Sequence, residues 1–384
     1  MASLVAVSTY RPCFAAPDGR RTTGPDEDLV TMAVAAAGPL RAAGAPSRIV
    51  LVSRQIADAP PSAAAVLAAA LGLDAVPVEL RLGGADAAVD SLLTAAAGML
   101  VVAVETGREP AAAAALVGAG DGLADASRTR RGFAIAEPSG VHDDPRLVRD
   151  RAWTPVAAAL AEAQPAVVTG PPVRAARGLA GADAPAAPEA EGAPAPLAAL
   201  AALARAGKPA RVVGVEGASA CAVDLVDPAA QVVAVERAAT VPLAPPPAPG
   251  GEIPVSLSAF ERAFESKVGL KAARCVCGAL SYPPRALCLE CGAEGAGELE
   301  PLPRTGEVYS VVTVHAPVPG RRVPYSVAVV ELDGAAVRVL APVTDAVPGS
   351  APIGTRGELV LRRMAVRQGI VDYGYAFQPA EVPA

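Results

Sequence analysis

The stretch RCVCGALSYPPRALCLECG, residues 274–292, holds four of the six cysteines of the chain. They form a C-x-C pair and a C-x-x-C pair with ten residues between them. Four thiolates from two such turns suit a closed tetrahedral zinc site, which is structural because no position is left for a water ligand. The stretch therefore predicts a zinc ribbon, and the expected metal ligands are Cys275, Cys277, Cys288 and Cys291.

Two features of the stretch bear on this prediction. Gly278 and Gly292 each follow the second cysteine of a pair, where glycine permits the backbone conformation that turns amides toward metal-bound sulfur. The first pair is one residue shorter than the usual C-x-x-C, which would either weaken the site or mark a lineage that has lost the metal. Free thiols or a disulfide are the alternatives.

The bulk composition excludes several classes of partner. The chain has 384 residues, a net charge of −6 and a pI near 5.2, which argues against nucleic acid or an anionic membrane, since both need clustered positive charge. Its longest apolar stretch, residues 92–104, is shorter than the about 20 residues that a spanning helix needs. Aromatic residues make up only 3%, so the cores must be built from Val, Leu and Ala.

The N-terminal sequence and the remaining cysteines bear on the cellular compartment in which the protein is expected. The start, MASLVAVSTYRP, has no basic segment followed by an apolar run and a cleavage site, so we expect no signal peptide. Cys13 and Cys221 lie far apart, and the other four are at metal spacing, which fits a reducing compartment better than a disulfide framework. We expect a cytoplasmic protein.

Two stretches are rich in proline and alanine, and one of them is expected to separate two domains. Residues 240–254 (TVPLAPPPAPGGEIP) mark a change in composition and are expected to form a semi-rigid linker, because proline fixes φ and removes a donor. Residues 181–198 read as a surface loop, since helical and strand patterns continue on both sides. The predicted organisation is one domain over 1–239, the linker, and a second domain over 255–384.

The part before the linker alternates short apolar runs with alanine-rich helical patterns, which predicts a layered α/β domain with strands buried on both faces. The expected helices are residues 27–40, 62–73, 153–163 and 196–207, and the expected strands are 47–54, 98–105, 165–170 and 210–217. After the linker, β-branched runs separated by Gly, Pro and Asp predict a small antiparallel barrel. These runs are residues 306–318, 325–334, 336–343 and 356–366.

The C-terminal part resembles a known family. The helical LSAFERAFESKVGL, the cysteine stretch with its internal YPPR, and the strand VPYSVAVVELDG together resemble the family that joins a rubredoxin-like zinc ribbon to an OB-fold. The resemblance covers roughly residues 255–380 and departs in the short first cysteine pair. It implies acyl-CoA metabolism and a companion that docks on thiolase-fold enzymes. An OB barrel can also bind nucleic acid, but the acidic charge and the scarcity of aromatic residues oppose that use.

The N-terminal part resembles hydroxymethylglutaryl-CoA synthase and related thiolase-fold proteins. The stretches VSTYRP and GPDEDLVTMAVAAA resemble their opening, and LARAGKPARVVGVEGASACAVDLV resembles their end, so that the likeness covers about residues 1–235. In active relatives the turn that VPVELRLGGADAAVDSLLTAA matches carries a nucleophilic cysteine just before a glycine pair. That position here is Arg81, whose guanidinium cannot be deprotonated and cannot attack a thioester.

A second position supports the same interpretation. PAVVTGPP resembles the family's strand that ends in His-x-Pro, and the residue that matches the histidine is Thr169. Cys13 and Cys221 do not match the nucleophile, and residues 77–90 contain no Cys, Ser or His. The resemblance therefore implies vestigial catalytic positions at Arg81 and Thr169. The plainer alternative for Arg81 is an ordinary surface arginine beside a helix start.

Three classes of function follow from these resemblances. The first is an accessory, non-catalytic subunit, a pseudoenzyme that helps a separate thiolase or ketosynthase to form or stabilise its acyl-CoA site. The second is an acyl-CoA-dependent acyltransferase or synthase that works without a covalent acyl-cysteine, by positioning its substrates and stabilising an oxyanion. The third is a plain scaffold without acyl-CoA contact. The expected ligands are structural Zn²⁺ and acyl-CoA, and a homodimer across the sheet edge is expected by analogy alone.

Overall fold

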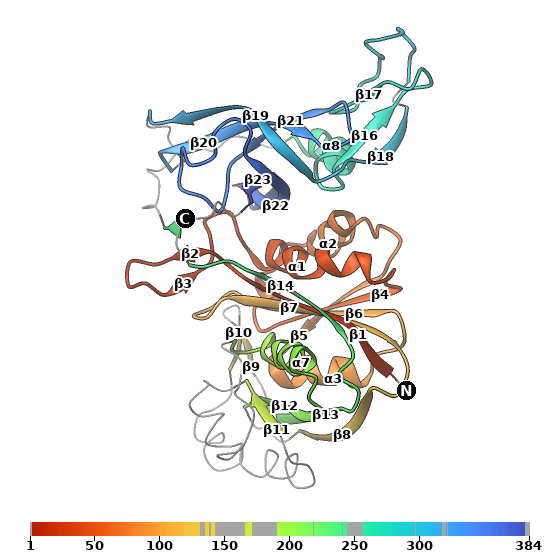
Figure 1. Ribbon diagram of the computed structural model, residues 1–384, viewed down its shortest axis with the longest axis vertical. Coiled ribbons are helices and arrows are strands. Elements are labelled where there is room, and N and C mark those ends of the chain that lie inside the picture. The colour runs from red at the N-terminus through yellow and green to blue at the C-terminus, as the bar shows by residue number, and fades with distance from the viewer. Residues whose placement is uncertain are drawn as a thin grey trace. The chain divides into compact units, whose positions relative to one another are not determined.

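A computed structural model describes residues 2–130, 135–137, 140–142, 166–170, 190–217, 219–239, 241–243, 256–295, 297–316, 320 and 322–380. The chain forms two compact units (Figure 1). Unit 1 comprises Met1–Pro12 and Leu29–Ala238, and unit 2 comprises Cys13–Asp28 and Ala239–Ala384. The predicted helix over residues 153–163 and most of the proline-rich stretch 240–254 lie outside the described residues.

The first half of unit 1 is built on five strands. Their order across the sheet is β5-β4-β6-β7-β1, in which β4, β5 and β6 run parallel and β7 runs antiparallel to both of its neighbours. These strands are β1 (Ala2–Arg11), β4 (Arg48–Ser53), β5 (Val78–Leu82), β6 (Met99–Glu105) and β7 (Ala111–Ala119). On its other edge β1 pairs in parallel with β14 (Gln231–Glu236).

The second half of unit 1 repeats this pattern with four described strands. Their order is β11-β12-β13-β8, with β11 and β12 parallel and β13 antiparallel to both neighbours. They are β8 (Leu123–Arg130), β11 (Ala166–Thr169), β12 (Ala210–Glu216) and β13 (Ser219–Leu225). A single residue pair, Ala2 with Leu123, links the two halves through β1 and β8. The short strands β9 (Ile135–Glu137) and β10 (Gly140–His142) pair only with each other and form a separate two-stranded sheet among the described residues.

Helices form layers around these strands. In Figure 1, α1 (Leu29–Ala37) and α2 (Ala63–Leu71) lie on one side of β1, β6 and β7, and α3 (Ala85–Leu93) and α7 (Ala195–Ala206) lie on the other. Both α3 and α7 contact strands of the two halves, so that they form a shared middle layer. Two 3₁₀ turns, Gly38–Ala42 and Ile56–Asp58, complete unit 1. The predicted layered α/β architecture is confirmed.

Small residues let the middle layer pack closely, as the alanine-rich composition requires. A Cβ on Gly214 of β12 would lie 2.2 Å from the carbonyl oxygen of Ala85, where α3 begins. The contacting atom belongs to the backbone, so it cannot move aside as a flexible side chain would. Glycine at this position therefore sets the distance between α3 and β12.

Unit 2 contains the predicted ribbon and barrel. Helix α8 (Leu257–Lys267) precedes a three-stranded sheet of β16 (Lys271–Arg274), β17 (Leu280–Ser281) and β18 (Glu298–Pro301). Five antiparallel strands follow in the order β21-β20-β19-β22-β23. They are β19 (Thr305–Val314), β20 (Tyr325–Leu332), β21 (Arg338–Pro342), β22 (Arg356–Arg367) and β23 (Ile370–Pro379). A bridge between Val343 and Phe377 closes them, which confirms the small all-β OB-fold barrel.

An N-terminal segment also belongs to unit 2. Cys13–Asp28 forms β2 (Phe14–Ala15) and β3 (Arg21–Thr22), which make a small sheet with β15 (Val241–Pro242). The chain consequently crosses between the units three times, after Pro12, after Asp28 and after Ala238. Among the helices of the described residues, none has both the length and the apolar character needed to cross a membrane.

We expect Gly214→Ala to destabilise unit 1 by about 1–3 kcal/mol, because the added methyl group must displace the start of α3. Chemical denaturation of the purified chain measures this loss. The matched control is Gly38→Ala, at which a Cβ would meet nothing within 4 Å. Equal stability of the Gly214 variant and the control would contradict the tight packing of α3 on β12.

Candidate functional site

The cysteine cluster is built by two turns of similar shape. Cys275 and Cys277 directly follow β16, and the Gly278 amide donates to the Cys275 carbonyl at 2.8 Å. In the second turn the Gly292 amide donates to the Cys288 carbonyl at 3.0 Å. Both glycines have positive φ, 89° and 71°, a conformation that residues with a side chain rarely adopt. The local sequence therefore folds both pairs into turns that direct their thiols to one point.

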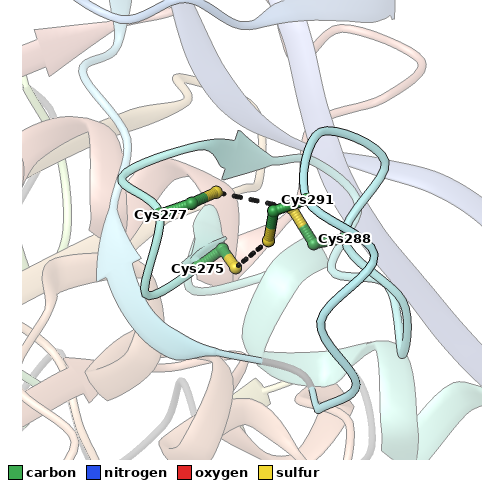
Figure 2. Close-up of side chains that lie close together, drawn as sticks. All are labelled: Cys275, Cys277, Cys288 and Cys291. Carbon is green, nitrogen blue, oxygen red and sulfur yellow. Dashed lines mark hydrogen bonds between the residues drawn. The ribbon is translucent and has the colours of Figure 1, made fainter.

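Figure 2 shows the four thiols facing one another, and their Sγ atoms all lie within 4.8 Å of each other. The Sγ atoms of Cys275 and Cys291 are 3.6 Å apart, and those of Cys277 and Cys288 are 3.7 Å apart. A disulfide needs about 2.05 Å, whereas thiolates about 2.3 Å from a tetrahedral zinc ion lie about 3.8 Å from one another. The arrangement fits a metal ion such as zinc, and the short first pair does not prevent the four thiols from converging.

Neighbouring groups favour thiolate at Cys288. The backbone amides of Cys291 and Glu290 donate hydrogen bonds to Cys288 and lower the pKa of its thiol to about 7. Arg274 braces the first turn, since its Nη1 donates to the Gly278 carbonyl at 2.9 Å and its Nε to Glu300 of β18 at 2.6 Å. All six cysteines lie in the described part of the chain, and none of them forms a disulfide there.

Arg81, the position that the resemblance aligns with a nucleophile, lies on β5 opposite Val52 of β4. Its guanidinium donates to Ser91 Oγ at 3.0 Å and forms an ion pair with Asp90, both on α3. Asp90 is also paired with Arg128 of β8 at 2.7 Å. The side chain of Arg81 therefore links a strand to the last turns of a helix and connects, through Asp90, to the second half of unit 1.

Thr169, the position aligned with a histidine, ends β11 and is buried. Its hydroxyl donates to the Val213 carbonyl of the neighbouring β12 at 2.9 Å. The other two cysteines are also accounted for by packing. Cys221 is part of the core of unit 1, and Cys13 packs with Phe14 in unit 2. Thr169 on β11 and Cys221 on β13 both lie opposite Gly214 of the intervening β12, whereas Arg81 lies on β5 and Cys13 belongs to unit 2.

A partly buried cluster of charges lies at the carboxyl ends of the strands, and the sequence analysis missed it. Arg54 follows β4, and Glu105 and Glu216 end β6 and β12. Arg54 Nη2 donates to Glu216 Oε2 at 2.7 Å, its Nη1 lies 3.7 Å from Glu105 Oε2, and Gln55 Nε2 donates to Glu105 Oε1 at 2.6 Å. These four residues form what we call the strand-end cluster. Its signal in the sequence is a charged residue directly after each of three apolar strand runs.

The strand-end cluster fills the space at the start of α3. A Cβ on Gly84, the residue that caps α3, would lie 1.9 Å from Glu216 Oε2. A Cβ on Gly192, shortly before α7, would lie 2.3 Å from Glu105 Oε2. Burial raises the pKa of the Glu105 carboxyl, and the Arg54 guanidinium opposes that shift. The two carboxylates therefore lie against the backbone at Gly84 and Gly192, where a side chain could not be added without displacing them.

Comparison with known proteins identifies relatives of unit 2. Residues 299–362 match the family described as ChsH2, C-terminal OB-fold domain. A DUF35 domain-containing scaffold protein of Methanothermobacter thermautotrophicus is 31% identical over 123 residues, which are 31% of this chain and 92% of the relative. A protein of the same description from Pyrococcus furiosus is 32% identical over 130 residues, 33% of this chain and 94% of the relative.

Solved structures are similar to both parts of the chain. The Ltp2-ChsH2(DUF35) aldolase is 28% identical and covers 31% of this chain and 90% of that chain, with a TM-score of 0.26. The priming β-ketosynthase of the R1128 polyketide pathway is 20% identical and covers 59% and 97%, with a TM-score of 0.47. A hydroxymethylglutaryl-CoA synthase complexed with CoA is 12% identical and covers 59% and 83%, with a TM-score of 0.47.

We expect the purified chain to carry about one zinc ion and Cys288→Ser to lose it, because a tetrahedral site without one thiolate binds the metal far more weakly. The variant should also melt at a lower temperature, since the binding energy of a structural metal is folding energy. Elemental analysis and thermal unfolding measure the two effects. Cys221→Ser, outside the cluster, is the control and should retain the metal. Unchanged metal content in the Cys288 variant would contradict the assignment of the ligands.

We expect Arg54→Met to destabilise unit 1 by about 3 kcal/mol, because it leaves two carboxylates close together without a cation. Arg48→Met is the matched control, because the Arg48–Glu79 pair is exposed and should contribute at most about 1 kcal/mol. Denaturant unfolding of both variants gives the difference.

The loss in Arg54→Met should depend on pH. The folded-state pKa of Glu105 is already raised above its ordinary value of 4.5, and removal of Arg54 raises it further. Stability that a group with a raised pKa contributes is present below the unfolded pKa and is lost as the pH rises through the folded pKa. The variant should therefore lose more stability than the native chain between pH 4.5 and neutrality. Parallel pH profiles would contradict this role of Arg54.

Proposed function

The chain belongs to the family of DUF35 domain-containing scaffold proteins, which unit 2 matches over most of their length, and on this premise we propose that it is an accessory subunit. Its catalytic partner in this proposal is a separate thiolase or ketosynthase that processes acyl-CoA. The chain helps to form or stabilise the acyl-CoA site of that enzyme and does not catalyse the reaction itself. It is a pseudoenzyme of acyl-CoA and lipid metabolism in the cytoplasm.

One observation carries the proposal that unit 1 is not catalytic. The Glu216 carboxylate lies against the Gly84 backbone at the start of α3, beside the turn at which the resemblance places an acyl nucleophile. Arg81 and Thr169 are then vestigial positions, whose side chains now hold α3 and β12 in place. Without a thiol or hydroxyl at this turn, unit 1 has no group there to form an acyl intermediate.

Unit 2 supplies the companion function. In this proposal Cys275, Cys277, Cys288 and Cys291 hold one structural Zn²⁺, which stabilises the ribbon and performs no chemistry. Because unit 2 is part of the same chain as unit 1, its docking is intramolecular and not bimolecular. Unit 2 therefore has a high effective concentration relative to unit 1. The acidic net charge of −6 supports neither nucleic acid nor an anionic membrane as a partner.

The outer edge of β5 supports the partner assignment. β5 is the last strand on its side of the described sheet, and Leu80 and Leu82 on it are 40% and 38% exposed. An edge strand with apolar side chains is a template for pairing with another strand. We propose that a thiolase-fold partner, or a second copy of the chain, pairs here.

Co-expression of the tagged chain with thiolase-fold enzymes of its source organism, followed by affinity purification, tests the proposal. We expect a stable complex on size-exclusion chromatography, and higher turnover of acetyl-CoA and acetoacetyl-CoA by the complex than by the enzyme alone. Leu80→Glu should weaken the complex about tenfold or more, by burying a charge at the β5 edge. Val226→Glu, at an exposed loop position of unit 1, is the control and should leave it intact. Turnover by the purified chain without any partner would contradict the accessory role.

A further inference from the structure

The acidic run Asp26–Glu27–Asp28 ends the N-terminal segment that belongs to unit 2. The segment leaves unit 1 after Pro12 and re-enters it at Leu29, where α1 begins. All three carboxylates of the run make contacts inside unit 2, and each contacts a different set of atoms. The contacts of the acidic run involve neither the metal cluster nor the strand-end cluster.

Asp26 is held by a side chain and by the backbone of the barrel. Thr344 Oγ1 donates to Asp26 Oδ2 at 2.7 Å, and the backbone amide of Arg363 donates to the Asp26 carbonyl at 2.8 Å. The Arg363 guanidinium also donates to the Pro25 carbonyl at 3.0 Å. This part of β22 has a free edge toward the segment, because only Arg356–Glu358 of β22 pair with β19.

Asp26 and Glu27 surround a buried arginine. The side chain of Arg362 is only 1% exposed, and a buried guanidinium is costly unless carboxylates compensate it. Arg362 Nη2 lies 2.6 Å from Asp345 Oδ2 and 3.9 Å from Glu27 Oε1, and its Nε lies 3.7 Å from Asp26 Oδ2. Two of the three carboxylates around Arg362 thus come from the N-terminal segment.

Asp28 completes the contact on β23. Its Oδ2 accepts a hydrogen bond of 2.7 Å from the hydroxyl of Tyr373, which is 1% exposed. Burial, followed by the Asp28 carboxylate, raises the pKa of Tyr373, so its hydroxyl stays protonated and remains a donor. The barrel offers donors to the acidic run on Thr344, Arg362, Arg363 and Tyr373. Burial and the nearby Asp345 carboxylate raise the pKa of Asp26, and the Arg362 guanidinium opposes that shift.

The other end of the segment is fixed by apolar contacts. Cys13, Phe14 and Val241 form a small buried cluster with Leu243 packed against it. The Val241 amide donates to the Cys13 carbonyl at 3.1 Å as β15 pairs with β2. Between the two anchored ends, Asp18 contacts Arg20 at the tip of the hairpin and is exposed. The segment is thus held at both ends and free at its tip.

We infer that Cys13–Asp28 is a docking segment, and that Thr344, Arg362, Arg363 and Tyr373 form an acceptor site in the barrel for an acidic Asp–Glu–Asp peptide. The chain fills this site with its own segment. Unit 2 is consequently incomplete without residues that precede α1, and a separated unit 2 would leave the donors of the acceptor site open to an acidic peptide from another molecule.

Hydrogen exchange on the full chain tests the docking. In the combined variant D26N/E27Q/D28N, the amides of residues 13–28 should exchange at least about tenfold faster than in the native chain. The reason is that the segment is no longer held against the barrel, so its amides are less protected. The matched control is Asp18→Asn, which removes one charge from the exposed tip of the same segment and should leave protection near Asp26 unchanged. Equal exchange in the native chain and the combined variant would overturn the inference.

Binding in trans tests the acceptor site. A fluorescein-labelled synthetic peptide of residues 13–28, with serine at position 13, is titrated up to about 1 mM against the full-length combined variant, since tethered segments act at about millimolar effective concentration. We expect saturable binding to the variant, and at least about tenfold weaker binding to the native chain, whose site is occupied. A folded variant that does not bind the peptide would overturn the inference.

A milder substitution covers the case in which the combined variant does not fold. Tyr373→Phe removes only the hydroxyl that donates to Asp28. It should speed exchange of the amides near Asp28 severalfold and leave exchange in α7 of unit 1 unchanged. Unchanged exchange near Asp28 in this variant would likewise count against docking.

Discussion

A single arginine, Arg54, holds together the carboxyl ends of strands from both halves of unit 1. It pairs with Glu216, which is 162 residues away in the sequence, and lies near Glu105 on β6. Glu216 in turn lies against Gly84 at the start of α3. Removal of Arg54 or of one of its carboxylate partners would leave an uncompensated charge with little access to water. The three side chains therefore keep the ends of their strands close together. The edge at which parallel strands usually present a ligand site is therefore used to hold the fold together.

Unit 2 depends on an interaction of the same kind. Arg362 is buried among carboxylates from two distant parts of the chain, Asp345 in the barrel and Asp26–Glu27 in the N-terminal segment. In both units a guanidinium, partly buried at Arg54 and fully buried at Arg362, joins segments that are far apart in sequence. Buried ion pairs contribute little net stability compared with apolar packing, but they strongly penalise arrangements in which one partner is missing.

The sequence predicted what depends on local pattern. The cysteine spacing predicted a cluster because each pair folds within one turn, and the alternation of strands and helices predicted the layered domain and the barrel. The strand-end cluster was missed because adjacency of Arg54, Glu105 and Glu216 depends on strand order, which periodicity does not specify. The placement of Cys13–Asp28 in unit 2 was missed for the same reason, since the contact of Asp26 with Arg363 spans more than 300 residues. Local composition contains no signal for such a contact.

The account depends on unit 1 having no acyl nucleophile of its own, and intact-mass spectrometry tests this most directly. The purified chain is incubated with acetyl-CoA at neutral pH, and its mass is compared with that of untreated chain. We predict an unchanged mass, because the cysteines outside the metal cluster, Cys13 and Cys221, are buried by packing. A stoichiometric acetyl adduct, mapped by peptide analysis to Cys221 of unit 1, would contradict the account.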